Sequence, residues 1–194
     1  QGCPAVLPTS WQCIEENLIG PKANLRNIDL YGADLTQTNL SGANLTFATL
    51  GGANLSGVDL ANADLTNAYI DFADLRNSNL IRTFLIGAVL YNSNLSNADL
   101  SWSFITDIQL DSADLKYVRA IGLIGCVDWI LPTHFRCVND GITEVGFTQF
   151  ETSSIVGPYV NLSDITLIDC DLFDANLSNA NLSDATLTDC DLTG

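Results

Sequence analysis

Cysteine is the residue type whose spacing most directly predicts chemistry in this chain. Four of the six cysteines form two short-range pairs, Cys3 with Cys13 and Cys126 with Cys137, and each pair encloses a loop with proline and aromatic residues. Zinc sites favour histidine ligands or two Cys-x-x-Cys pairs, and the whole sequence holds a single histidine. We therefore predict two disulfides, which persist in oxidising compartments and so indicate export.

The remaining cysteines, Cys170 and Cys190, lie twenty residues apart, and aspartate flanks each on both sides, at Asp169, Asp171, Asp189 and Asp191. Stacked carboxylates could bind a hard cation such as calcium, but we favour a repeated segment whose charges are screened by water, without a metal. If the segments stack, the two cysteine Cα atoms lie about 4.8 Å apart, within reach of a disulfide. Parallel Cβ directions are poorly aimed for that bond, so we predict free, buried thiols.

No residue pattern predicts catalysis or a cofactor. His134 is the single histidine, no serine or cysteine lies in a recognisable nucleophile motif, and the glycines lack a phosphate-binding spacing. A general acid and base need different environments, whereas most aspartates here occupy equivalent positions that we expect to face solvent. We therefore predict that the protein is not an enzyme, with no catalytic, cofactor-binding or metal-binding residues.

The elements that position these residues follow from a five-residue register. From Leu25 to Leu115 every fifth residue is leucine, replaced only at Ile70 and Ile105, and the residue two before it is usually alanine. A helix turns 100° per residue and a strand alternates its faces, so neither can bury this register. A chain that runs extended for about three residues and then turns a corner returns every leucine to the inside.

The outward residues indicate how many corners close one coil. Every twentieth position gives an alternating series of carboxylates and amides: Asp34, Asn54, Asp74, Asn94 and Asp114. A fifteen-residue step gives no such order. Carboxylates about 4.8 Å apart repel by about 1 kcal/mol in water and roughly 3.5 kcal/mol at an effective dielectric of 20. Alternation relieves that repulsion, so the sequence favours four sides per coil.

These A(D/N)Lxx units resemble the pentapeptide repeat family; they lie at 33–37, 43–47, 53–57, 63–67, 98–102 and 175–179. The resemblance implies an all-β solenoid, a right-handed quadrilateral parallel β-helix, here interrupted by a disulfide-bracketed loop. It implies little about function, because the family is large and mostly uncharacterised.

The interruption is similar to the start of the chain. The register breaks after Leu115 and resumes in another phase that includes Leu162, while Ile130–Thr133 and Phe135–Cys137 between them match Val6–Thr9 and Trp11–Cys13. We predict an N-terminal cap at 1–22, a first coiled block at 23–120, a cap-like insertion at 121–144 and a second block at 145–194. A continuous stack with one protruding loop is favoured over two semi-independent modules.

The insertion has two interpretations. The one we favour is a bracket that covers a coil end or bulges from the stack, stabilised by roughly 2 to 3 kcal/mol through its disulfide. The alternative is a recognition loop that presents Trp129, His134 and Phe135.

Composition excludes two classes of partner. The net charge is −16 with seven lysines and arginines, so direct nucleic-acid binding is not expected. Aspartate and asparagine interrupt every apolar run, so no membrane insertion is expected. The chain begins with Gln1 and contains no methionine, so we expect that any targeting segment has been removed or was never included.

Aromatic residues replace aspartate or asparagine on one part of the outside. Phe84 and Phe104 are twenty residues apart at outward positions, with Trp102 nearby and Tyr69 and Val89 on the adjacent face. Large apolar patches usually mark contacts. The partner could be another protein, a second copy in a homo-oligomer, or the chain's own bracket.

The function predicted from these features is a non-enzymatic scaffold or protein-interaction module with an unidentified protein partner. The family resemblance and the cysteine pairs favour a periplasm or thylakoid lumen, and reduced cysteine pairs would instead indicate the cytoplasm. The alternative, implied by family members that resemble DNA in shape and charge, is an acidic DNA mimic that binds a type II topoisomerase.

Overall fold

The structure is a computed structural model of the 194-residue chain. It describes residues 3–4, 6–126, 131, 135–139, 144–145, 148–149, 152–168, 170, 172–173 and 175–193.

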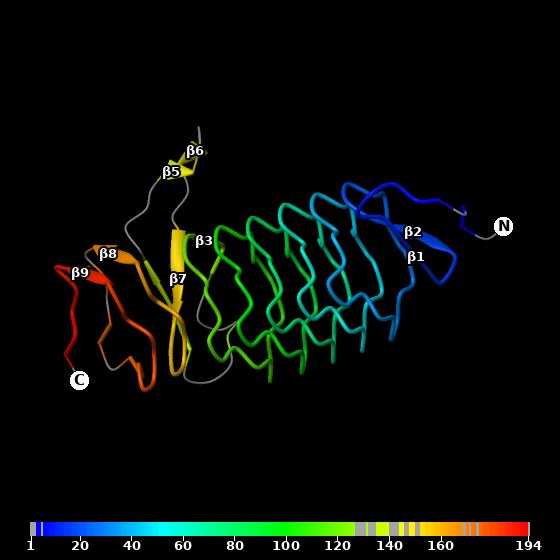
Figure 1. Cartoon of the computed structure of the whole chain (residues 1–194). Helices are drawn as coiled ribbons and strands as arrows, with labels where there is room; N and C mark the ends of the chain where they lie inside the picture. The colour runs from blue at the N-terminus through cyan, green and yellow to red at the C-terminus, as the bar shows by residue number, and fades with distance from the viewer. Residues whose placement is uncertain are drawn as a thin grey trace.

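Most of the described chain is a solenoid of parallel coils (Figure 1). Isolated parallel bridges join residues twenty apart, from Asn24 and Asn44 to Phe104 and Ile124. After the first coil, the outward residues of the ladders bond to the preceding coil through both backbone groups. For example, the Asn54 N–H donates to Ala33 O at 2.9 Å, and the Leu35 N–H donates to Asn54 O at 2.8 Å. One coil therefore takes twenty residues and is tied to its neighbours by the backbone.

The corners explain the polar residues of the register. At a typical corner the Ala33 N–H donates to Leu30 O at 3.1 Å, and Gly32 between them has φ of 67°. Glycine and asparagine accept this left-handed conformation at least cost. The outward carboxylate or amide then closes the next corner, because Asp34 Oδ1 accepts the Thr36 N–H at 3.1 Å. Local sequence therefore specifies each turn.

The core is a column of leucines with small residues beside them. Leucines such as Leu45, Leu65 and Leu85 have an exposed fraction of 0%, and Ala63 is equally buried. Burial of one leucine side chain contributes on the order of 2 kcal/mol. The small alanines leave room for the leucines of the other walls.

The named strands lie at the two ends of this column and in the interruption. β1 (Gln12–Ile14) and β2 (Asn17–Ile19) form an antiparallel hairpin at the N-terminal end. β3 (Leu123–Ile124), β7 (Thr152–Val156) and β4 (Arg136–Asn139) form an antiparallel sheet in that order. β5 (Glu144–Val145) pairs with β6 (Thr148–Gln149), and this pair projects from the stack (Figure 1). β8 (Thr166–Ile168) and β9 (Thr186–Thr188) are parallel.

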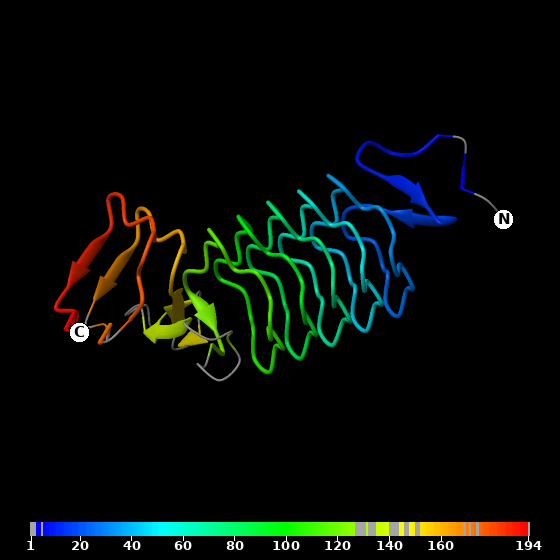
Figure 2. The ribbon, with the colours of Figure 1, turned by 90° about the horizontal axis from the view of Figure 1, so that it is seen from below.

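The second block continues the first along part of the coil, as the view from below also shows (Figure 2). The Asn161 N–H donates to Val118 O at 2.9 Å, just as the Arg119 N–H donates to Ala98 O at 2.9 Å. Asn161 thus takes the next place after Arg119, although it follows by 42 residues instead of the regular 20. Between Arg119 and Asn161, the described strands β3, β7 and β4 make the antiparallel sheet. No helix in the described part of the chain has the length and apolar character to span a membrane.

Candidate interaction surface

Two disulfides close the repeated start motif. Cys3 is bonded to Cys13 and Cys126 to Cys137, with Cα–Cα distances of 5.9 and 5.8 Å. The first fixes the N-terminal segment to β1, and the second ties the end of the coiled block to β4. This is the pairing that the sequence predicts. Trp129 and His134 lie outside the described residues, and Phe135 is half-buried and packs on the core.

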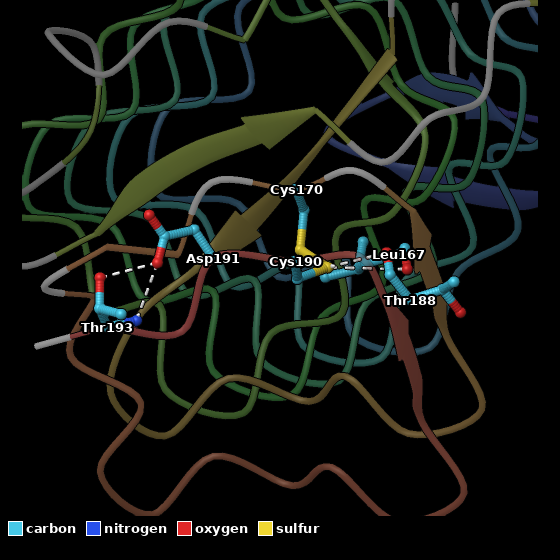
Figure 3. Close-up of a disulfide and its surroundings, with 6 residues drawn as sticks. All are labelled: Leu167, Cys170, Thr188, Cys190, Asp191 and Thr193. Atoms are coloured by element: carbon cyan, nitrogen blue, oxygen red, sulfur yellow. Dashed lines mark hydrogen bonds between the residues drawn. A yellow bond between two sulfur atoms is a disulfide. The ribbon is translucent and has the colours of Figure 1, made fainter.

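The expectation of free thiols at Cys170 and Cys190 is wrong. These residues form a disulfide between consecutive coils, with Cα atoms 4.4 Å apart (Figure 3). The Cα atoms are closer than the regular ladder spacing of about 4.8 Å. Cys170 is buried but Cys190 is half-buried, and the Cys190 Sγ lies 3.7 Å from Leu167 O. The Cys190 side chain therefore tilts toward the preceding coil, which the argument from parallel Cβ directions did not allow.

The carboxylates near these cysteines are partly engaged. Asp191 accepts hydrogen bonds from the Thr193 hydroxyl at 2.7 Å and from the Thr193 N–H at 3.0 Å. Both bonds lower the pKa of Asp191 below its usual value, and the bond from the hydroxyl contributes more. Asp169 and Asp171 lie outside the described residues. The hypothesis of a cation between stacked aspartates therefore stays untested.

On the acidic surface, one amide is hydrogen-bonded to a carboxylate of the preceding coil. Asn79 Nδ2 donates to Asp59 Oδ1 at 3.0 Å, and Asp99 occupies the next coil of the same ladder. The alternation of charge and amide thus provides a hydrogen bond as well as spacing the charges.

The aromatic residues divide into separate groups. The Phe84 and Phe104 rings stack with centroids 4.7 Å apart and planes at 9°, and Phe84 is 38% exposed. Tyr69, 53% exposed, pairs with Val89 in another ladder. Trp102 is half-buried, and its ring covers Gly122, where an added Cβ would lie 2.5 Å away. The structure therefore brings Phe84 and Phe104 into contact, whereas Trp102 packs against Gly122 instead.

Trp102 lines a groove that sequence reasoning missed. It encloses about 580 Å³ between the first block and the segment 164–168. Its walls include Ile81, Arg82, Ser101, Trp102, Ile121 and Thr166. Two arginines of a strongly acidic chain, Arg82 at a corner and Arg119 at an outward position, are the sequence signal that could have indicated it.

The coil architecture and a family model lead to the same assignment. The model for pentapeptide repeats matches eight copies, over residues 23–60, 43–80, 70–107 and 159–194, which is more than half of the chain. The chain belongs to the pentapeptide repeat family. This confirms the resemblance seen in the A(D/N)Lxx units, and the fold is a right-handed β-helix solenoid.

Solved pentapeptide repeat proteins show how far the likeness extends. The protein Rfr23 from the cyanobacterium Cyanothece 51142 is 26% identical with a TM-score of 0.52, over 53% of this chain and 83% of that one. A pentapeptide repeat protein from Nostoc PCC 7120 is 40% identical over 42% and 67%, with a TM-score of 0.41. QnrB1, a plasmid-mediated fluoroquinolone resistance protein, is 15% identical over 90% and 67%, with a TM-score of 0.48. No curated protein matches the sequence.

Breaking the alternation on this pentapeptide repeat coil is expected to destabilise it. Asn79→Asp removes the hydrogen bond to Asp59 and places a carboxylate between Asp59 and Asp99. We expect the free energy of unfolding at pH 7 to fall by about 1 to 3 kcal/mol, with the difference shrinking below about pH 4 as carboxylates become protonated. Urea unfolding measures this. Asn24→Asp is the control because its ladder neighbour is Asn44, and an equal loss in both variants would contradict the charge argument.

Arg76 stabilises a carboxylate of the pentapeptide repeat surface. Its Nη2 lies 2.6 Å from Asp74 Oδ2, and this hydrogen bond is the main reason that the pKa of Asp74 is lowered. A pKa that is lower in the folded state than in the unfolded state stabilises the fold at every pH above the unfolded-state pKa of about 4. This stabilisation is lost as the pH falls through the pKa of the folded state. Arg76→Gln should raise the pKa of Asp74 in an NMR titration, with little change in stability at neutral pH because the pair is exposed and screened by solvent. An unchanged pKa would contradict this.

Two serines at the alanine position of the pentapeptide repeat form a matched pair. Ser78 and Ser93 are 2% and 1% exposed, but Ser93 donates to Leu90 O at 2.8 Å while the Ser78 hydroxyl has no described partner. A buried hydroxyl without a partner costs about 1 to 3 kcal/mol. We expect Ser78→Ala to be more stable than Ser93→Ala by about 1 to 2 kcal/mol in urea unfolding. The reverse order would show that Ser78 has a partner in solution.

Proposed function

We propose that this pentapeptide repeat protein is a non-enzymatic protein-interaction module of an exported compartment, built on a four-sided coil. The stacked Phe84 and Phe104 support the proposal most directly, because they replace the aspartate or asparagine of the register at outward positions, where Phe84 is 38% exposed and Phe104 is half-buried. Stacked aromatic rings are rigid, large contact surfaces, and such residues dominate the binding energy of protein interfaces.

Export is supported by the cysteines. All six are paired in three disulfides, and such bonds persist in oxidising compartments and are rare in the cytosol. A periplasm or a thylakoid lumen fits this chemistry. Mass analysis of the protein from its native source, after alkylation without reductant, should find no free thiol. Several alkylated cysteines would favour the cytoplasm instead.

Replacement of the stacked rings tests the interaction. In Phe84→Asn with Phe104→Asn, asparagine restores the residue type of the ladder, so we expect the coil to stay folded while partner binding or self-association is lost. Affinity capture from the native compartment and sedimentation measure the two forms of contact. Phe72→Asn is the control, since Phe72 is also exposed but lies outside the stack. Unchanged binding, oligomeric state and melting temperature in the double variant would refute the role of the stack.

A second candidate is an acidic mimic of DNA that binds a type II topoisomerase. The net charge of −16 favours it, whereas amides halve the charge density of the two ladders that contain Asn54 and Asn79. Inhibition of topoisomerase supercoiling by the oxidised protein would support this candidate, and lack of any effect would remove it.

A further inference from the structure

The groove beside Trp102 exists because the coil is split on one side. The first and second blocks bond directly through Asn161 and Val118. On the next side, β3 pairs with β7 instead of with β8. Among the described strands β8 therefore pairs with β9 and not with the first block, and residues 164–168 form one wall of the groove.

Within the described residues, the split leaves one edge of β8 without a strand partner. In a regular coil, the N–H and C=O of an outward residue such as Asn54 both bond to the preceding coil. Thr166 occupies this outward position, since it pairs with Thr186 of the following coil. Neither its N–H nor its C=O bonds to any residue within the described ranges, where the strand partner of β8 is β9. An unpaired strand edge is a template for another extended chain.

The walls of the groove can hold side chains of such a chain. Trp102 is fixed against Gly122, and Ile81 and Ile121 supply apolar surface. The Ser101 hydroxyl, in the same wall, is buried without a described hydrogen-bond partner. A volume of about 580 Å³ is within the usual range of ligand pockets, about 300 to 1,000 Å³.

Charge distinguishes between possible peptides. Asp99 and Asp164 line the groove, and neither forms an ion pair with a described residue. Arg119 donates to Ser163 O at 2.7 Å and so holds the joint between the blocks, while Arg82 is exposed and reaches solvent. Because the whole chain carries −16, its field attracts cationic chains and repels acidic ones.

We propose that the groove binds an extended basic peptide segment of a partner protein, which adds as a strand to the open edge of β8. The backbone of Thr166 supplies the hydrogen bonds, Trp102 and the isoleucines contact apolar side chains, and Asp99 and Asp164 attract lysine or arginine. The proposal rests on the proposed role in protein interaction, and it assigns a second surface, separate from the phenylalanine stack.

The test uses the full oxidised protein and a capped heptapeptide of alternating lysine and valine, with binding followed by calorimetry. Thr166→Pro removes the N–H that strand addition needs, and Thr166→Val keeps the N–H with a side chain of similar size. We expect wild type and Thr166→Val to bind alike, and Thr166→Pro to bind about tenfold more weakly, the loss expected for one hydrogen bond. Raised salt should weaken binding, because the attraction is electrostatic.

Two further peptides keep the test independent of how well Thr166→Pro folds. A peptide methylated on alternate backbone nitrogens should not bind the wild-type protein, and an alternating glutamate and valine peptide should bind more weakly than the lysine peptide. Equal binding of the methylated peptide, tighter binding of the glutamate peptide, or no binding of the lysine peptide at about 1 mM would overturn the proposal. The double variant Phe84→Asn with Phe104→Asn should bind the lysine peptide as the wild type does. The peptide assay therefore tests the groove alone, and the capture and sedimentation experiments on the double variant test the phenylalanine stack alone.

Discussion

Leu65→Ala is expected to lower the free energy of unfolding by about 2 to 5 kcal/mol, because it opens a cavity in the middle of the leucine column. Leu65 is completely buried, and the coils on either side place Leu45 and Leu85 next to it. Backbone ladders on every side restrain these coils, so they cannot collapse far into the gap. Urea unfolding followed by circular dichroism measures the loss.

Thr66→Ala is the matched control for Leu65→Ala. Thr66 is the next residue of the same coil, is half-exposed, and its backbone N–H rather than its side chain bonds to Asp64 Oδ1 at 3.0 Å. Surface changes of this kind usually stay within about 0.5 kcal/mol. A Leu65→Ala variant as stable as Thr66→Ala would mean that the column is not close-packed.

Removal of the Cys170–Cys190 disulfide is expected to open the last coil without unfolding the rest. The inward residues Leu177 and Leu187 are half-buried there, and Leu192 is 58% exposed, so burial stabilises this coil less than the central ones. A disulfide that spans 20 residues stabilises by about 3 kcal/mol in the loop-entropy model. In a solenoid each coil contacts its neighbours alone, so the effect should stay local.

Hydrogen exchange with mass analysis checks this in the variant Cys170→Ala with Cys190→Ala. Amides of β9 should exchange about a hundredfold faster, and amides near Leu65 should not change. Cys3→Ala with Cys13→Ala is the control, because that disulfide closes the opposite end. Unchanged exchange in β9 would mean that stacking alone holds the last coil.

The sequence by itself determined the repeating coil. Each corner, such as Leu30 to Ala33, is closed by one hydrogen bond within four residues, and each outward carboxylate or amide bonds two residues along the chain. Such interactions are short-range, so the five-residue register was enough to predict them. The short cysteine pairs at the two start motifs could be predicted for the same reason, since each lies within one loop.

Only the tertiary structure decided what depends on contacts between distant segments. The 42-residue step from Arg119 to Asn161 and the pairing of β3 with β7 both arise where an antiparallel sheet interrupts a parallel ladder. The same interruption leaves β8 with β9 as its strand partner in the described part of the chain. The disulfide between Cys170 and Cys190 depends on the tilt of the Cys190 side chain toward the preceding coil, which the parallel Cβ directions of an ideal ladder did not give. The periodic sequence specifies identical coils because their hydrogen bonds are local. The position of the interruption instead depends on how whole segments, distant in sequence, pack against one another.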